Sequence, residues 1–323
     1  MLRLFANANY DFIALRRWAY ALTGLFIVPG LVLLLVRGLN YSIEFTGGTL
    51  VQIKTAQPVD DGVIRTALDA GGVPGADVQQ FGSPTEYAIR ARLVAAEGAP
   101  PAGTEQTVAA VRRALDAAIG AGTYETVRTE AVGPKVGREL QEKALIAILV
   151  SFVITLMYLA VRFEWRFGLA AIAATAHDIL ATIAFIRYLD LEVSLVVVAA
   201  VLAIVGYSLN DTIVIFDRVR ENLRKYRRQN LYEILNLSVN ETLPRTILTG
   251  GTTMLTALAL AFIAGAVIRP FSLVMAFGIT VGTFSSIYVA SPVLLWVEKR
   301  WPGEDARGAR TLGTRAPAAS PPA

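Results

Sequence analysis

One carboxylate, Asp211, lies inside an apolar stretch of the sequence that is long enough to cross a lipid bilayer. The stretch opens near Leu195 and ends on a cluster of charged residues after Phe216. A carboxylate near the centre of a membrane helix costs about 2.5–3.5 kcal/mol, so it should face protein or a water-filled cavity. Tyr207 and Ser208 precede it on the same helix face. The stretch therefore predicts either a functional site or a hydrogen-bonded polar cluster that packs helices.

Composition supports a membrane protein, because 54% of the 323 residues are hydrophobic. The absence of cysteine excludes disulfides and thiolate metal sites, and the single histidine, His177, excludes a multi-histidine metal site. No phosphate-loop pattern G-x-x-x-x-G-K-[ST] occurs. We therefore expect no cofactor or metal, and the modest net charge of +4 favours basic residues that set membrane orientation over a nucleic-acid partner.

Apolar runs separated by charged segments predict a membrane bundle of six transmembrane helices. The first run has no small-x-small cleavage site before Arg37, so we expect an uncleaved span rather than a signal peptide. The expected segments are an N-terminus over 1–17, spans over 18–37, 144–161, 167–188, 193–216, 246–263 and 271–296, an outer domain over 38–143, a basic loop over 217–245, and a tail over 297–323 that is disordered from Gly303.

The segment between the first two spans predicts a small α+β domain. Strands are expected over 49–54, 78–81, 87–93 and 123–132, and helices over 60–70 and 105–119. This βαββαβ order is typical of a two-layer, ferredoxin-like domain.

Basic residues predict the orientation in the membrane. The short connections on one side hold only Arg37, Arg187 and Arg269, whereas most other arginines and lysines near span ends lie on the opposite side. Both termini should therefore be cytoplasmic and the α+β domain extracytoplasmic. The basic run 218–228 would contact anionic lipid or a cytoplasmic partner.

His177 and Asp178 form a second ionisable pair, midway along the third span. Such a pair could relay protons, because imidazole titrates near neutral pH. Adjacent helical residues point about 100° apart, so the two side chains are not expected simply to face each other. The alternative is a buried aspartate that bonds a neighbouring helix.

Arg245 begins the fifth span, and hydroxyls follow it at helical spacing from Thr249 onward. This stripe could line a hydrated path and hold a cation near Asp211. Alternatively, Arg245 is an interfacial residue that reaches toward the headgroups, and the threonines bond their own helix.

Glycines mark two further features. Gly278 and Gly282 recur with Ser286 every four residues in the sixth span, which favours close helix packing. The pairs Gly47-Gly48 and Gly133-Pro134 mark the two junctions with the outer domain and predict tight turns with a hinge role.

Four motifs resemble the SecF family of bacterial protein secretion. They are YSIEFTGGTL at 41–50, AVGPKVGREL at 131–140, RFEWRFGLAAIAATAHD at 162–178, and GYSLNDTIVIFDRVRENLRK at 206–225 with NETLPRTILTG at 240–250. Ser42 and Glu44 stand where the family's first motif has glycine and aspartate.

This resemblance implies half of an RND-type transporter in the bacterial inner (plasma) membrane. The other half would be SecD, and the pair would work with the SecYEG channel on a translocating preprotein, driven by the proton-motive force. The family's membrane carboxylate corresponds to Asp211, in the motif that includes Ser208 and Asn210, and its arginine and threonine partners to Arg245 and Thr249. The alternatives are an RND-like exporter of lipids or small molecules and a structural assembly subunit without ion coupling.

Overall fold

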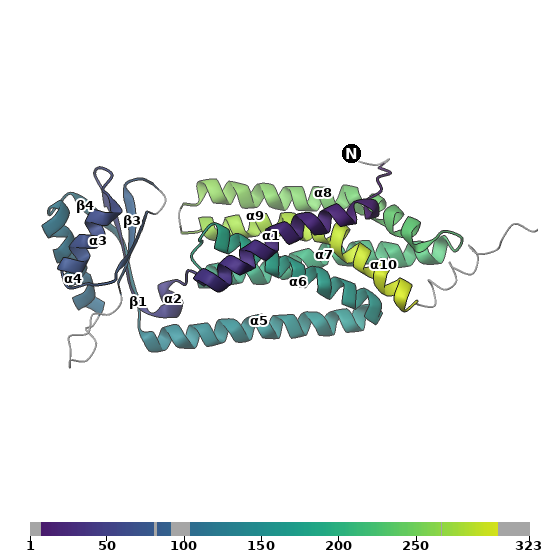
Figure 1. Cartoon of the computed structure of the whole chain (residues 1–323), viewed down its shortest axis with the longest axis horizontal. Coiled ribbons are helices and arrows are strands. Elements are labelled where there is room, and N and C mark those ends of the chain that lie inside the picture. The colour runs from purple at the N-terminus through teal and green to yellow at the C-terminus, as the bar shows by residue number, and fades with distance from the viewer. Residues whose placement is uncertain (1–7, 81–82, 92–103, 266, 303–323) are drawn as a thin grey trace, which may run out of the picture.

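The computed structural model describes residues 8–80, 83–91, 104–265 and 267–302, so the expected disordered tail from 303 lies outside the described residues. The chain forms a small sheet domain at one end and a bundle of long helices at the other (Figure 1). Within the described residues, six helical segments are long and apolar enough to cross a membrane. This agrees with the six spans expected from the apolar runs.

The sheet domain has the predicted βαββαβ order. Its elements are β1 (Gly48–Thr55), α3 (Asp61–Ala70), β2 (Asp77–Gln80), β3 (Glu86–Ala91), α4 (Thr104–Ile119) and β4 (Tyr124–Val132). The strands lie in the order β2-β3-β1-β4, and all neighbours are antiparallel. The core lies between the sheet and its two helices, and it is built from residues such as Val51, Ile53, Leu68, Tyr87 and Leu115. Figure 1 shows α3 and α4 on the side of the sheet that faces away from the membrane helices.

The bundle consists of helices that follow the expected spans with extended ends. They are α1 (Arg16–Arg37), preceded by the short helix η1 (Ile13–Leu15), α5 (Pro134–Arg162), α6 (Trp165–Tyr188), α7 (Leu195–Lys225), α8 (Leu231–Ile263), α9 (Arg269–Ser285) and α10 (Ser291–Arg300). A one-turn helix, α2 (Ile43–Thr46), connects the first span to the sheet domain.

One expectation about the bundle was wrong, and one helix begins earlier than its expected span. The basic loop expected over 217–245 is helical except for residues 226–230, because α7 keeps Val219 and Leu223 buried and α8 begins at a capping box built by Asn230 and Glu233. The second span begins as a helix at Pro134, ten residues before the expected start, since proline suits the first helical turn and no breaker follows it.

The sixth span contains a turn of π-helix, η2 (Ser286–Ala290), that the sequence reasoning missed. Pro292 follows this turn and has no N–H to donate to the carbonyl four residues earlier, so the helix cannot keep its ordinary bonding there. The Ser291 hydroxyl donates instead to the carbonyl of Ser286 at 3.1 Å.

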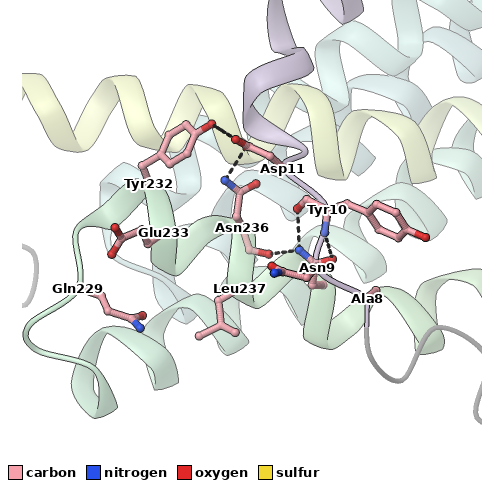
Figure 2. Close-up of a pocket in the computed structure, with 10 residues that line it drawn as sticks. Ala8, Asn9, Tyr10, Asp11, Gln229, Tyr232, Glu233, Asn236 and Leu237 are labelled. Carbon is pink, nitrogen blue, oxygen red and sulfur yellow. Dashed lines mark hydrogen bonds between the residues drawn. The ribbon is translucent and has the colours of Figure 1, made fainter.

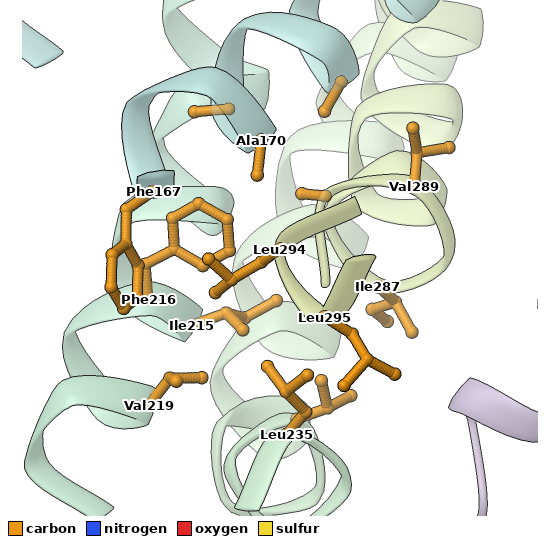
Figure 3. Packing of buried hydrophobic residues seen from close by; sticks show 14 of the residues in the cluster. Phe167, Ala170, Ile215, Phe216, Val219, Leu235, Ile287, Val289, Leu294 and Leu295 are labelled. Atoms are coloured by element: carbon orange, nitrogen blue, oxygen red, sulfur yellow. The ribbon is translucent and has the colours of Figure 1, made fainter. Parts of the chain in front are cut away.

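Aromatic and branched residues fill the half of the bundle that lies away from the sheet domain. The rings of Phe167 and Phe216 meet edge to face with centroids 5.3 Å apart, and Ile215, Leu235 and Leu294 are buried around them (Figure 3). This packing holds α6, α7, α8 and α10 together in one hydrophobic cluster.

Candidate functional site

Asp211 lies on α7 and is enclosed by the bundle, with only 3% of its surface exposed. Its carboxylate accepts one described hydrogen bond, from the Thr283 hydroxyl on α9 at 3.4 Å. No ion pair within 4.0 Å involves Asp211 among the described residues. The carboxylate is therefore buried in protein, as expected, but among the described residues it accepts only one long hydrogen bond.

Arg245 forms no contact ion pair with Asp211, because no atoms of the two charged groups lie within 4.0 Å of each other. It lies on α8 directly after Pro244, and its side chain is exposed on this chain alone. Among the described residues, no cation lies at contact distance from the Asp211 carboxylate.

The threonines after Arg245 bond their own helix, which is the alternative that the sequence left open. The Thr249 hydroxyl donates to the Arg245 carbonyl at 2.9 Å, and Thr252, Thr253 and Thr256 repeat this bond to the carbonyls four residues earlier. The Tyr207 hydroxyl reaches the Thr253 hydroxyl at 3.4 Å. A hydrated path along this stripe stays a prediction.

Asp178 on α6 lies in a much richer polar environment. Its carboxylate accepts bonds from the hydroxyls of Ser208, on α7, and of Ser285, on α9, the latter at 2.7 Å. The ring nitrogen Nδ1 of His177 lies 2.9 Å from the carboxylate. The expectation that these adjacent side chains do not face each other was wrong, because both are long enough to curl over the same turn.

Residues near Asp211 in sequence therefore serve different partners. Ser208 was expected on the Asp211 face, but it donates to Asp178, and Thr212 bonds the Ser286 hydroxyl at 2.9 Å. The Asn210 side chain is exposed. Ser285 was missed, because a serine within an apolar run carries no pattern that reveals its distant partner.

Small residues on α9 allow this helix to approach α7, the helix that carries Asp211, very closely. A Cβ atom added at Gly282 would lie 2.9 Å from Cβ of Ser208, and one added at Gly278 would lie 2.2 Å from Cδ1 of Ile204. The four-residue spacing on α9 thus matches the spacing of Ile204, Ser208 and Thr212 on α7. The prediction that Gly278 and Gly282 allow close packing is confirmed.

The two junctions of the outer domain pack against each other. Gly47 and Gly48 have φ of +72° and +130°, in the region that favours glycine. A Cβ atom at Gly47 would lie 2.8 Å from Cα of Pro134, and one at Gly137 would lie 2.9 Å from the Gly47 nitrogen. Gly133 has an ordinary φ of −66° and caps the start of α5. The tight turn at Gly47-Gly48 is observed, and the hinge role stays a prediction.

Glu44 has a structural role that the sequence did not reveal. Its carboxylate accepts the Leu195 N–H at 2.6 Å, at the first residue of α7. A negative charge at a helix N-terminus is favourable. Because Val193 also pairs with the backbone of Asn40 and Ser42, the first junction is bound directly to the helix that carries Asp211.

Residues 8–11 lie against the N-terminal part of α8. Asn240 pairs with the backbone N–H and carbonyl of Tyr10 at 2.9 and 2.8 Å, and Asn236 and Tyr232 donate to Asp11 (Figure 2). A polar cavity of about 470 Å³ opens between the two segments.

No group of three or more histidine, aspartate or glutamate side chains within the described ranges could hold a metal ion. The polar groups around Asp178 and Asp211 include carboxylates, hydroxyls and one imidazole, which are groups that can carry protons.

Comparisons with known proteins agree on one family. The model for the C-terminal part of "Protein export membrane protein SecD/SecF" matches residues 113–300, and that for the "SecD/SecF GG Motif" matches residues 32–59. The protein translocase subunit SecF of Gemmatimonas aurantiaca is 56% identical over 315 residues, which are 97% of this chain and 94% of that protein. The same subunit of Escherichia coli O157:H7 is 38% identical over 88% of this chain and 87% of its own length.

Solved structures agree with this grouping. A crystal structure of SecDF, a translocon-associated membrane protein from Thermus thermophilus, matches 92% of this chain with a TM-score of 0.82 and 36% identity. SecDF in a super-membrane-facing form matches 94% of the chain with a TM-score of 0.65 and 37% identity. In both cases this chain spans 40% of the matched chain.

Proposed function

The chain belongs to the SecD/SecF family of protein export membrane proteins, and from this membership and the Asp211 site we propose that it couples proton entry to protein export. Its relatives are translocase subunits, so the chain is an accessory transport subunit that crosses the membrane several times. Its task is to drive or complete the translocation of preproteins without enzymatic chemistry.

The working unit is a complex with SecD. This chain corresponds to 40% of SecDF, which leaves room for a second, complementary half. The exposed guanidinium of Arg245 and the exposed stripe at Thr252 and Thr256 then become the surface that the other half covers. The SecYEG channel, the preprotein and membrane lipid are the further partners.

The complex lies in the bacterial inner membrane with both termini of this chain in the cytoplasm. The asymmetry of basic residues supports this orientation, because Arg218, Arg220, Arg224 and Lys225 extend from the end of α7 opposite the sheet domain. The sheet domain is then on the outer side, where a preprotein emerges.

Asp211 is the group that takes up and releases the proton. The observation that carries this assignment is its burial with one long hydrogen bond and no described ion pair within 4.0 Å. A buried carboxylate that is neither ion-paired nor fully hydrogen-bonded changes protonation at little structural cost, because few partners must rearrange. Arg245 and Thr249 shape the path to this group. Asp178 and His177 form a second candidate station, connected to α7 through Ser208.

The membrane potential supplies enough energy for such a cycle. Moving one charge across the full membrane is worth about 2.3 kcal/mol per 100 mV. One proton therefore biases a two-state element by about fifty-fold per 100 mV. Gly47-Gly48 and Gly133-Pro134 are the points about which the sheet domain moves.

The test is Asp211→Asn in vesicles that contain the SecD partner and the channel. We expect export to lose its stimulation by a proton gradient while folding and assembly with SecD persist. Asp217→Asn is the matched control, because Asp217 lies on the same helix, pairs with Arg162 at its exposed end, and should leave the stimulation unchanged. Normal gradient-dependent export by Asp211→Asn would contradict the proposal, and loss of the complex itself would favour a structural assembly subunit.

A further inference from the structure

Arg90 connects the sheet domain to the membrane helices. It lies on β3 and points from the sheet face opposite α3 and α4, since its neighbours Ile89 and Ala91 are in the domain core. Its guanidinium bonds Glu192, in the connection between α6 and α7, at 2.6 Å and Asn40 at 3.4 Å. Among the described residues, the side-chain hydrogen bonds that join residues 48–132 to the membrane part all come from Arg90.

The ion pair spans the glycine junction. On the membrane side, the collar Asn40–Thr46 is held to the start of α7 by Glu44 and by the backbone of Val193. The sheet begins at once after this collar, at Gly48. Rotation about Gly47-Gly48 would leave the collar in place and would separate Arg90 from Glu192.

The contact is built so that it can open without leaving an unpaired charge on Arg90. The guanidinium also bonds Asp77 at 2.8 Å and Gln79 at 3.3 Å, both on β2 of its own sheet. The Glu192 side chain keeps 24% of its surface exposed and would become hydrated on release. Separation therefore exchanges Glu192 and the longer bond to Asn40 for water, which is a small cost at a partly exposed site.

Apolar packing does not hold the two parts together here. The buried residues of the sheet domain form one cluster, and Phe45, Ile186 and Val193 belong to a separate one. A cavity of about 450 Å³ lies between them, lined by Gly47, Gly48, Asp77 and Arg90 among others. The sheet domain thus has space beside the junction in which to move.

Arg90 binds Glu192 in the segment that connects α6 and α7, the two helices that carry the buried carboxylates. Asp178 lies on α6 and Asp211 on α7, and Ser208 bonds one helix to the other. A shift of α7 relative to α6 must therefore change the position of Glu192.

We propose that Arg90 and Glu192 are positioning residues that form a releasable latch between the sheet domain and the α6–α7 connection, and that its opening frees the sheet domain during export. The latch rests on the proposed proton-coupled function, because the shift of α6 and α7 is what opens it.

The experiment measures the position of the sheet domain by spin-label distances in the complete complex with SecD and the channel, in lipid vesicles. The chain contains no cysteine, so Ala117→Cys on α4 and Val36→Cys at the outer end of α1 provide specific label sites. Glu192→Gln removes the charge across the junction. Asp77→Asn is the matched control, because it removes a carboxylate from the same guanidinium within the domain.

For the chain with an unaltered Arg90–Glu192 contact and for Asp77→Asn, we expect one main distance between the labels at positions 117 and 36. Glu192→Gln should raise a second, displaced population about fivefold. A proton gradient should populate the same displaced distance in the unaltered chain, and Asp211→Asn should abolish this response without abolishing the effect of Glu192→Gln.

Equal distributions for Glu192→Gln and Asp77→Asn would overturn the latch, as would a gradient that supports export without moving the sheet domain. Failure of the proposed function looks different. In that case Asp211→Asn keeps gradient-driven export, while the comparison of Glu192→Gln with Asp77→Asn still reports on the contact itself.

Discussion

Asp178 and Asp211 are both buried carboxylates in the same bundle, but their surroundings differ sharply. Asp178 is 1% exposed and is surrounded by Ser208, Ser285 and His177. Asp211 is 3% exposed and is bonded by Thr283 alone among the described residues, at 3.4 Å. Depth of burial therefore does not distinguish the two, whereas the number of hydrogen-bond donors does.

From this difference we predict a structural role for Asp178, beside its candidate relay with His177, and a change of charge at Asp211. A group held by several donors on three helices ties those helices together, and losing it leaves the donors without a partner. A group with few partners contributes little to packing but can gain or lose a proton without disturbing its neighbours. We therefore expect substitutions at the two sites to affect different properties.

The largest effect on stability should come from Asp178→Ala. The Ser208 hydroxyl and the His177 ring would lose their acceptor, and a buried polar group without a partner costs about 1–3 kcal/mol, so we expect a loss of about 2–4 kcal/mol. Thermal unfolding of the purified chain measures it. Asp178→Asn, which keeps an acceptor, should recover part of the lost stability. An unaltered unfolding temperature for Asp178→Ala would contradict the structural difference between Asp178 and Asp211.

Gly282→Ala should cause the second largest loss of stability. Gly282 lies on α9 against Ser208, the residue that donates a hydrogen bond to Asp178. The added Cβ atom would clash with Ser208 at 2.9 Å, and overpacking of this kind typically costs about 1–3 kcal/mol. Gly206→Ala is the control, since nothing lies within 4 Å of its added Cβ atom and alanine favours a helix. The same unfolding measurement should find Gly206→Ala neutral or stabilising; destabilisation by both variants would point to the helices themselves rather than to the contact.

Asp211→Leu should change stability by less than about 1 kcal/mol. Replacing a buried charge that lacks an ion pair by an apolar side chain is often neutral or stabilising. The variant should nevertheless lose the response of export to a proton gradient, which reconstituted vesicles would measure. A loss of stability as large as that of Asp178→Ala would show that both carboxylates are structural.

The smallest effect concerns a third carboxylate, Asp11, which lies at the surface before the first span. The hydrogen bond from Tyr232, with further bonds from the Ala14 N–H and Asn236, holds the pKa of Asp11 below its ordinary value of 3.8. A depressed carboxyl pKa stabilises the folded state fully above pH 3.8, and this contribution is lost as the pH falls through the lower folded value.

Limited proteolysis of the N-terminal segment between pH 6 and pH 3 measures this tether. We expect cleavage to increase at the acid end in the unaltered chain, and Asp11→Asn to be cleaved faster near neutral pH with a smaller change on acidification. Identical pH profiles for the two chains would show that the bonds of Asn240 to Tyr10 hold the segment without Asp11.

Much of the fold was predictable because it depends on local patterns. Long apolar runs require membrane helices, and short alternating segments with glycine turns produced the βαββαβ order of the sheet domain. The extent of α5 and α8 was less predictable, since charged residues permit a helix as readily as a loop outside the membrane. The π-turn at Ser286–Ala290 had a signal in Pro292, but proline also occurs in helices that continue undisturbed.

The candidate site was predictable in part. A carboxylate at position 211 stands out because it interrupts an apolar run, and Gly278 and Gly282 stand out by their spacing. Ser285, Glu44 and Glu192 did not, because their partners Asp178, Leu195 and Arg90 lie far from them in the sequence. Pairs between distant segments produce no periodic pattern in the sequence that would reveal them.

Six membrane spans, a small α+β domain between the first two of them, and buried acids at 178 and 211 could all be read from the amino-acid sequence. These properties follow from local hydrophobicity and turn chemistry. The folded arrangement was needed to learn that Asp178 accepts several hydroxyl hydrogen bonds, that Asp211 accepts one long one, and that Arg90 reaches Glu192. The physical reason is that a hydrogen bond between distant segments depends on how helices pack, and that packing is set by the whole bundle.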